Sequence, residues 1–301
     1  MSFAEPTRPS TVRIWLLAAR PRTLPAAVAP VLVGTALAHR LGGEFSLLAF
    51  IATMLGSLLI QIGTNLANDY SDARRGADTE ERLGPVRVTA GGLVPPKQVL
   101  MATWGTFGAA FLVGIYLIAI SGWPLLVVGL LSILAGLLYT GGPRPYGYEG
   151  LGEVFVFIFF GLVSVAGTYY VQTVDLIWEA VALAAPVGLL SAAILIVNNV
   201  RDMDTDRTAG KRTLAVRLGR ERTRLLYAVV VFGSFPLALL PWPLSPLGPG
   251  LLISWLALPL AIGPVRTVRT RVDGPALNAC LANTAKLEIA FCALLSIGIL
   301  I

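Results

Sequence analysis

Two short polar segments, each at the end of a long apolar run, carry the same pattern of amides and carboxylates. The first contains Asn65, Asn68, Asp72, Gly76 and Thr79, and the second contains Asn199, Asp202, Asp206, Gly210 and Thr213. Every member of the first set lies 134 residues before its counterpart in the second. Acidic side chains among apolar helices are costly and usually functional, and divalent cations favour oxygen ligands. The pattern therefore predicts one cation site built from two equivalent segments.

Helical spacing places the polar residues of each segment on one face. Neither segment contains His or Cys, so the ligand chemistry favours Mg²⁺ bridged to substrate phosphates over zinc. We predict Mg²⁺ as the cofactor. The expected catalytic carboxylates are Asp69, Asp72, Asp202 and Asp206, and the expected metal ligands are Asn68, Asp69, Asp72, Asp78, Asp202 and Asp206. The alternative is helix caps and solvated loop charges, an interpretation that suits Asp78 or Asp204 taken alone.

Polar and basic residues around the two segments form a candidate diphosphate site. Arginine and lysine bind phosphate oxygens, although cations beside a membrane-spanning helix also serve topology alone. In the glycine- and proline-rich stretch 139–153, an aromatic ring can stabilise a carbocation or simply anchor the chain at the interface. The expected binding residues are Asn65, Asn68, Asn199, Arg22, Arg74, Arg144, Lys211, Arg212 and Tyr139.

The elements that must position these residues are membrane-spanning helices. The chain has 301 residues, of which 55% are hydrophobic and 13% are charged, and its mean hydropathy is +0.75. A soluble domain has about 25% charged residues, so an all-α polytopic membrane protein is expected. Nine apolar windows of spanning length occur, at about 24–38, 46–67, 98–120, 123–140, 151–171, 177–199, 225–242, 247–265 and 284–301.

Basic residues predict the topology of these helices. With the N-terminus inside, nearly all Lys and Arg fall in the N-terminal segment and in every second loop, and Arg40 alone lies in an outer loop. This asymmetry predicts an N-in, C-out protein of the cell membrane with its site on the cytoplasmic side. The net charge of +6 then marks the cytoplasmic face and anionic lipid, and no nucleic-acid partner is expected.

The 134-residue offset also predicts the domain organisation. One transmembrane domain covers 1–301, with pseudo-repeat halves at about 20–145 and 150–270 and an extra helix at 284–301. Parallel repeats are related by an axis along the membrane normal, so both acidic segments are expected at the same depth, facing a shared centre.

Several long segments together resemble the UbiA superfamily of intramembrane prenyltransferases. They are RPRTLPAAVAPVLVG near the N-terminus, NDYSDARRGADTEERLGPVRVTAGGL (68–93), YTGGPRPYGYEGLGE (139–153) and NNVRDMDTDRTAGKRTLAVRLG (198–219). Asn68, Asp69 and Asp72 match the superfamily motif NDxxDxxxD, but Gly76 replaces its last acid, which leaves Asp78 as the nearest candidate. This variant resembles the branch that prenylates 1,4-dihydroxy-2-naphthoate.

The resemblance implies a fold and a reaction. About nine helices are expected around a central cavity, with a polyprenyl diphosphate and 1,4-dihydroxy-2-naphthoate as substrates and membrane lipid as the surroundings. The prenyl group replaces the carboxyl group of the acceptor, giving demethylmenaquinone for menaquinone synthesis. Alternatives are a prenyltransferase for another acceptor, such as 4-hydroxybenzoate, haem, homogentisate or a lipid glycerol phosphate, a cation-coupled transporter, and a CDP-alcohol-type phosphotransferase.

Overall fold

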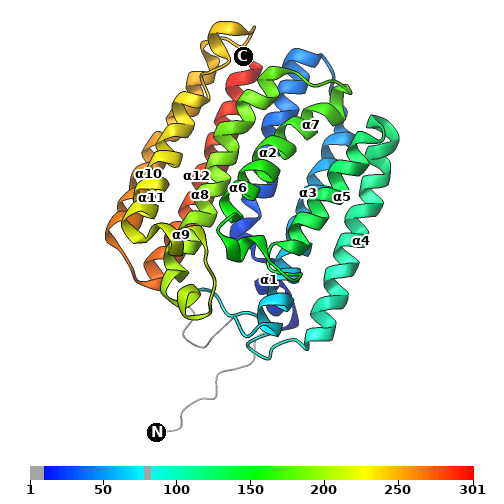
Figure 1. Ribbon diagram of the computed structural model, residues 1–301. Helices are drawn as coiled ribbons and strands as arrows, with labels where there is room; N and C mark the ends of the chain where they lie inside the picture. The colour runs from blue at the N-terminus through cyan, green and yellow to red at the C-terminus, as the bar shows by residue number, and fades with distance from the viewer. Residues whose placement is uncertain (1–9, 78–82) are drawn as a thin grey trace.

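The computed structural model describes residues 10–77 and 83–301 as a bundle of helices, and no strand occurs in these two ranges (Figure 1). The elements are α1 (Thr11–Ala19), η1 (Pro21–Thr23), α2 (Pro25–Leu37), η2 (Ala38–Gly42), α3 (Leu47–Arg74), α4 (Pro96–Ser121), α5 (Pro124–Leu138), η3 (Tyr146–Glu149), α6 (Gly152–Val156), η4 (Phe157–Val163), α7 (Ser164–Thr173), α8 (Trp178–Thr208), α9 (Leu214–Leu218), α10 (Arg220–Leu237), η5 (Trp242–Leu244), η6 (Pro249–Ala257), α11 (Leu258–Thr270) and α12 (Gly274–Leu300).

Within the described residues, seven continuous helical segments are long and apolar enough to cross a membrane. A bent pair, Thr11–Thr23 with Pro25–Gly42, adds an eighth span if it is counted as one, and its two parts meet at 51°. The shorter apolar helix α5 has 15 residues. The all-α polytopic fold is therefore confirmed, while the count of nine spans and the N-in, C-out orientation stay predictions.

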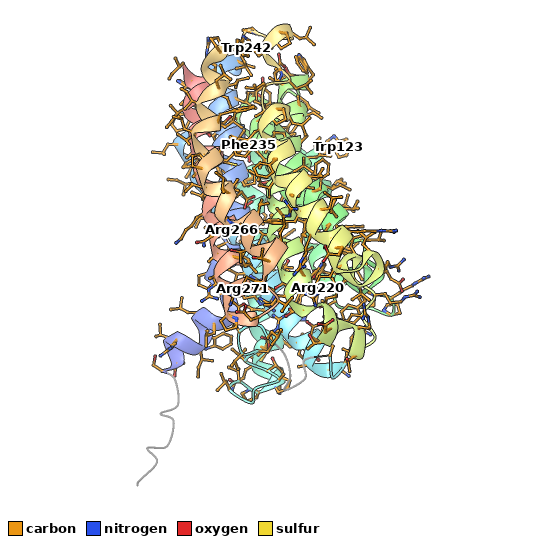
Figure 2. All side chains as sticks on the ribbon, turned by 90° about the vertical axis from the view of Figure 1, so that its left-hand side faces the viewer. Trp123, Arg220, Phe235, Trp242, Arg266 and Arg271 are labelled. Carbon is orange, nitrogen blue, oxygen red and sulfur yellow. The ribbon has the colours of Figure 1, made fainter. Side chains whose placement is uncertain are left out.

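The last helix begins earlier than its apolar window indicates. α12 starts at Gly274, where the side chain of Asp273 caps the helix by accepting a 3.0 Å hydrogen bond from the amide of Ala276. The first turns of α12 are polar enough to escape a hydropathy window, although their cap and the following proline are ordinary helix-start signals. The two ends of the bundle differ in the residues that they carry. Arg220 and Arg271 lie toward the end that carries α1, and Trp242 lies at the opposite end (Figure 2).

The two acid-bearing helices, α3 and α8, end with the same local geometry. Gly76 and Gly210 follow the helix ends with positive φ angles of 65° and 75°, a conformation in which glycine has no steric penalty. The amide of Ala77 bonds to the carbonyl of Asp72 at 3.0 Å, and the amide of Lys211 bonds to the carbonyl of Asp206 at 2.8 Å. The repeated glycine is thus a helix stop that leaves Asp72 and Asp206 in the last turns of their helices.

The largest hydrophobic core surrounds α8. Its fully buried residues include Leu183, Leu190 and Val197, which pack with apolar residues of α2, α10 and α12. α3 lies on the other side of the cavity and packs mainly against α4, with α5 and α2 beside it. The two acidic segments are therefore carried by different parts of the bundle and approach each other at one end of it.

Candidate active site

A cavity of about 340 Å³ lies between α3 and α8, with its polar residues concentrated at one end. Along α3 the lining extends from Thr53 to Asp72, which corresponds to about 28 Å at 1.5 Å per residue. The polar end is lined by Asn68, Asp72, Asn198, Asn199, Asp202, Asp206 and Lys211. Residues from both halves of the chain therefore contribute to one site, as the paired motifs predict.

Asp72 is a carboxylate of the site that contacts a tyrosine and two cations. Its side chain is buried, and its Oδ1 accepts a 2.6 Å hydrogen bond from the hydroxyl of Tyr148. The Nζ of Lys211 lies 3.6 Å from Oδ1, and a guanidinium nitrogen of Arg87 lies 3.5 Å from Oδ2. Lys211 is only 7% exposed, and both cations line the cavity. One buried and one largely buried cation beside the cavity form a site suited to a dianionic or trianionic group.

Asp69 faces away from the cavity lining. Its Oδ2 and Oδ1 accept hydrogen bonds from the amides of Val88 and Thr89, at 3.1 Å and 2.9 Å. The carboxylate is 1% exposed and holds the loop that contains Val88 and Thr89 against α3. In this geometry Asp69 holds a loop. To bind a metal ion, as predicted, its carboxylate must first lose the hydrogen bonds from Val88 and Thr89.

The second motif presents Asp202 and Asp206 to the cavity. The buried guanidinium of Arg201 pairs with the carboxylate of its neighbour Asp202 and also donates to the side-chain oxygen of Asn278 at 2.7 Å. This pairing orients Asp202 and attaches α8 to α12. Asp206 is partly exposed and lies where α8 meets the loop that carries Lys211.

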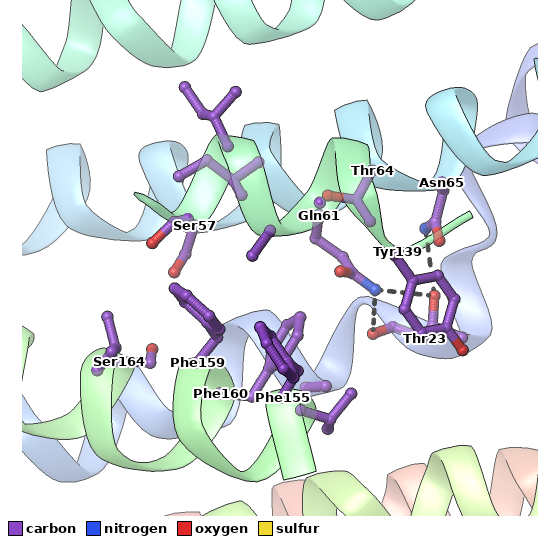
Figure 3. Close-up of a pocket in the computed structure, with 18 of the residues that line it drawn as sticks. Thr23, Ser57, Gln61, Thr64, Asn65, Tyr139, Phe155, Phe159, Phe160 and Ser164 are labelled. Carbon is purple, nitrogen blue, oxygen red and sulfur yellow. Dashed lines mark hydrogen bonds between the residues drawn. The ribbon is translucent and has the colours of Figure 1, made fainter. Parts of the chain in front are cut away.

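The amides of the two motifs are held by fixed partners. Nδ2 of Asn65 donates to the carbonyl of Ala19 at 2.9 Å and to the hydroxyl of Thr23 at 3.3 Å, and Gln61 donates to the same hydroxyl at 3.3 Å (Figure 3). Nδ2 of Asn199 donates to Oε1 of Glu153 at 2.8 Å. The side-chain oxygen of Asn68 accepts from Thr140 at 3.0 Å.

Only one of the five basic residues predicted to bind the diphosphate lines the cavity. Lys211 lines the cavity, whereas the four predicted arginines are exposed and do not: Arg22, Arg74, Arg144 and Arg212. Arg74 donates to Tyr70 at 3.2 Å, and Arg144 pairs with Glu149 at 3.3 Å. The backbone amide of Arg212 bonds to the carbonyl of Tyr148, and Asp78 lies outside the described residues. Binding roles for these residues stay predictions.

Three residues outside the predicted binding set also line the polar end, namely Arg20, Arg87 and Tyr148. Arg20 ends α1 in the left-handed conformation, at φ 54°, and donates to the carbonyl of Asn65 at 3.3 Å. The chain then turns through η1, so that Arg20 lines the cavity and Arg22 is exposed. A helix-end signal at Arg20 was absent from the sequence, because an arginine rarely adopts this conformation.

Five aromatic residues form an aromatic wall along the cavity, namely Tyr139, Tyr146, Phe155, Phe159 and Phe160. Tyr139 packs edge-to-face on Tyr146 at 5.5 Å, and Tyr146 stacks on Phe155 at 4.0 Å between ring centroids. Figure 3 shows Tyr139 near Thr23, with Phe155, Phe159 and Phe160 grouped along the wall. Tyr139 lines the cavity, so its polarisable aromatic ring is available to a positive charge there.

The apolar end of the cavity opens toward the lipid-facing surface. Phe111 of α4 and Leu126 and Leu130 of α5 line the cavity and are also exposed. Four glycines from four helices line the same region: Gly56, Gly114, Gly129 and Gly167. A Cβ built at Gly114, Gly129 or Gly167 meets no atom within 4 Å, so these positions border open space. Such a channel accommodates a long hydrocarbon chain.

The donor set fits a divalent cation delivered together with phosphate. In the described part of the chain, no three acidic, histidine or cysteine side chains converge closely enough to hold a metal by themselves. Carboxylates of Asp72, Asp202 and Asp206 nevertheless line one cavity end, together with asparagine amides and three cationic side chains. Mg²⁺ keeps waters and is held by one or two carboxylates plus substrate phosphates, which matches this dispersed set.

The sequence as a whole matches a known family. The model of the UbiA prenyltransferase family matches residues 27–294. The chain belongs to the UbiA prenyltransferase family. Among curated UbiA-family relatives, 1,4-dihydroxy-2-naphthoate octaprenyltransferase of Mycobacterium tuberculosis is 45% identical over 260 residues, which cover 85% of this chain and 87% of the relative. The Escherichia coli protein of the same name is 40% identical over 285 residues and 92% of each chain.

Solved structures of UbiA homologues share the fold. A homologue from Aeropyrum pernix K1, solved in its apo form, has a TM-score of 0.69 at 15% identity and covers 89% of this chain and 94% of its own. A homologue from Archaeoglobus fulgidus, solved bound to GPP and Mg²⁺, has a TM-score of 0.64 at 14% identity, with 94% and 99% covered. The arrangement of helices around the cavity is thus the UbiA arrangement.

Proposed function

We propose that this UbiA-family protein transfers a polyprenyl group from a polyprenyl diphosphate to 1,4-dihydroxy-2-naphthoate. Diphosphate and CO₂ leave, and the product is demethylmenaquinone. The observation that carries the proposal is a single cavity whose charged end is continuous with an apolar channel open toward lipid. The acceptor is assigned from relatives of 40–45% identity that carry the corresponding name.

The charged end binds the diphosphate. Arg87 and Lys211 lie beside Asp72, and Arg20 lines the cavity from the end of α1. Asp72, Asp202 and Asp206, with Asn68, would hold Mg²⁺. When bound, the cation neutralises charge that develops on the leaving diphosphate. Arg87 and Lys211 add to this stabilisation, because fixed cations in a site shielded from water interact strongly with developing charge.

The aromatic wall protects the reacting carbon. The allylic carbon of the substrate follows directly after the diphosphate and therefore lies between the cations and the rings of Tyr139 and Phe155. Aromatic faces stabilise positive charge on that carbon, and they exclude the water that would hydrolyse it. The electron-rich ring of the naphthoate then attacks from the same chamber. The prenyl tail follows the apolar channel past Gly114 and Gly129.

The protein acts at the cytoplasmic side of the cell membrane. Support comes from Arg220, which pairs with Asp204 of α8, and from Arg271, which lies toward the same end of the bundle (Figure 2), because cytoplasmic loops are enriched in Lys and Arg. The same placement disfavours a cation-coupled transporter, whose ion-binding carboxylates lie near the middle of the bilayer. Asp72 and Asp206 instead occupy the last turns of α3 and α8.

The test uses purified protein in detergent with a polyprenyl diphosphate, Mg²⁺ and either 1,4-dihydroxy-2-naphthoate or 4-hydroxybenzoate. We expect diphosphate release and a decarboxylated prenyl naphthoquinol, identified by mass spectrometry, only with the naphthoate. Excess EDTA, with metal removal verified, abolishes turnover. A prenylated 4-hydroxybenzoate as the main product contradicts the acceptor assignment, and full turnover in EDTA contradicts the metal requirement.

A further inference from the structure

Glu153 is a buried carboxylate that has no role in the proposed binding of either substrate. It is the second residue of α6 and is 6% exposed. Its Oε1 accepts the 2.8 Å hydrogen bond from Asn199, and its Oε2 is buried without a hydrogen-bond partner. Glu153 does not itself line the cavity, whereas Asn199 does. A buried carboxylate that is only half satisfied costs stability, so its retention calls for a functional reason.

The bond to Glu153 fixes which end of the Asn199 amide faces the substrate. A side-chain amide has a donor end and an acceptor end, and a carboxylate oxygen takes only the donor end. The reverse orientation brings the amide oxygen of Asn199 against Oε1 of Glu153, with both atoms acceptors. The Nδ2 of Asn199 therefore points to α6, and its Oδ1 is left for the cavity. Beside the carboxylates of α8, an oxygen attracts a cation, whereas an amide nitrogen repels it.

The first half of the chain reaches the same result by a different route. Asn65, the counterpart of Asn199 in the 134-residue repeat, directs its Nδ2 to the backbone carbonyl of Ala19. Ala19 is in turn the residue 134 positions before Glu153. The two amides thus donate to acceptors at equivalent sequence positions, one in the backbone and one in a side chain. Both halves leave an amide oxygen for the shared cavity.

Helix geometry explains why the second half needs a glutamate. Ala19 is the last residue of α1, and the chain bends after it, so its carbonyl is available to Asn65. α6 instead continues past position 153 into η4, and the carbonyl of Glu153 accepts from the amide of Phe157. A carbonyl inside a helix is already paired, so the side chain supplies the acceptor there. The carboxylate of Glu153 takes over the function of the carbonyl of Ala19.

We propose that Glu153 is a positioning residue that holds the amide oxygen of Asn199 toward the cation and diphosphate end of the cavity. The inference rests on the proposed prenyl diphosphate site and deepens it. Residues behind metal ligands set ligand orientation, and their loss lowers metal affinity about 10–100-fold. Glu153 acts through Asn199, so its contribution disappears when Asn199 is removed.

The experiment measures Mn²⁺ affinity by electron paramagnetic resonance, with an unreactive prenyl diphosphate analogue present, beside kcat and KM. Glu153→Met removes the acceptor in a side chain of similar length, and Glu153→Gln keeps an acceptor without the charge. Asn199→Ala and the double variant complete a cycle. The control is Glu288→Met, which removes another buried glutamate, on α12, that is bonded to Ser191 and has an oxygen without a partner.

We expect Mn²⁺ affinity to fall about tenfold in Glu153→Met and to stay within about twofold of the native value in Glu153→Gln and Glu288→Met. The double variant binds Mn²⁺ no worse than Asn199→Ala. Native affinity in Glu153→Met, or losses that multiply in the double variant, overturns the proposal. If Glu153→Met does not fold, Glu153→Ala takes its place in the same cycle. Failure of the native protein to release diphosphate overturns the proposed function instead, and the Mn²⁺ measurements still decide the role of Glu153.

Discussion

The hydroxyl of Tyr148 donates a 2.6 Å hydrogen bond to Oδ1 of Asp72 and thereby joins the loop between α5 and α6 to the end of α3. The same ring faces two cations, with Nζ of Lys211 at 4.8 Å and the guanidinium carbon of Arg75 at 5.8 Å from its centroid. One tyrosine therefore contacts a carboxylate from the first half and a cation from the second. It organises the charges of both halves before substrate arrives.

Replacing Tyr148 with Phe removes this hydrogen bond and keeps the ring. A hydrogen bond to a charged group contributes about 1.5–3 kcal/mol, so we expect kcat/KM to fall about 10–100-fold. Tyr146→Phe is the control, because the hydroxyl of Tyr146 donates to the backbone carbonyl of Ala135 at 2.9 Å and contacts no carboxylate of the site. Steady-state kinetics with prenyl diphosphate check both. Equal losses in the two variants contradict a specific role for Tyr148.

Asp72→Asn and Asp206→Asn each abolish turnover in a folded protein. The two residues hold equivalent places in the repeat, and each supplies charge from its own side of the cavity. We expect kcat to drop by at least about 10³-fold, equal to about 4 kcal/mol of barrier. Asp204→Asn, which removes an exposed partner of Arg220, keeps native activity. A loss of only a few-fold in Asp72→Asn indicates a structural role for that carboxylate.

Asp69→Asn acts through the loop and not through the metal. An amide has one acceptor oxygen, so it satisfies one of the two backbone amides of Val88 and Thr89 and turns a donor toward the other. We expect about 1–3 kcal/mol less protection of these amides, measured as faster hydrogen exchange in residues 83–95. Native exchange there, combined with lost Mn²⁺ binding, supports metal ligation by Asp69 and contradicts the loop role.

We expect Arg20 and Arg22 to differ in function, because Arg20 lines the cavity and Arg22 is exposed. Arg20→Met removes a cation that lines the cavity, so KM for the prenyl diphosphate rises about tenfold, whereas Arg22→Met leaves it within about twofold. The comparison uses two arginines only two positions apart, which makes each the control of the other. A larger effect at Arg22 shows that the segment rearranges when substrate binds.

Gly114→Leu shortens the prenyl chain that the enzyme accepts. Gly114 borders the apolar channel, and a leucine side chain there occupies space needed by the tail. Gly108 lies on the same helix, also has free space around its Cβ position, and is outside the cavity lining, so Gly108→Leu is the matched control. Activity is compared across geranyl, farnesyl and longer diphosphates. We expect about a tenfold loss for long chains only, in Gly114→Leu only.

The helical fold could be predicted from the sequence. So could the set of acids and amides that line one end of the cavity. Regular spacing inside a continuous helix determines a face, and α3 and α8 are continuous through Asp72 and Asp206. The sequence was not sufficient for Asp69, because its partners are backbone amides of Val88 and Thr89 in a distant loop, which no side-chain pattern records.

The cations show a second limit of sequence reasoning. Helical spacing predicts which residues share a face only within one helix. The left-handed conformation of Arg20 ends α1, so the spacing no longer applies to the residues after it. Charge counting also treats all arginines of the expected cytoplasmic loops alike, although Arg87 is largely buried beside Asp72 and Arg144 is exposed. Only the packing of loops against α3 distinguishes the two residues.

The channel that runs along α3 and opens between exposed residues of α4 and α5 has a kinetic consequence. We expect a lipid-tailed substrate to enter from the bilayer through this opening, so the protein would meet it by diffusion in two dimensions. The quantity that sets the rate is then the mole fraction of prenyl diphosphate among the surrounding lipids, and not its amount per volume of solution. Diluting the substrate with inert phospholipid slows the enzyme, while diluting the vesicles with buffer does not.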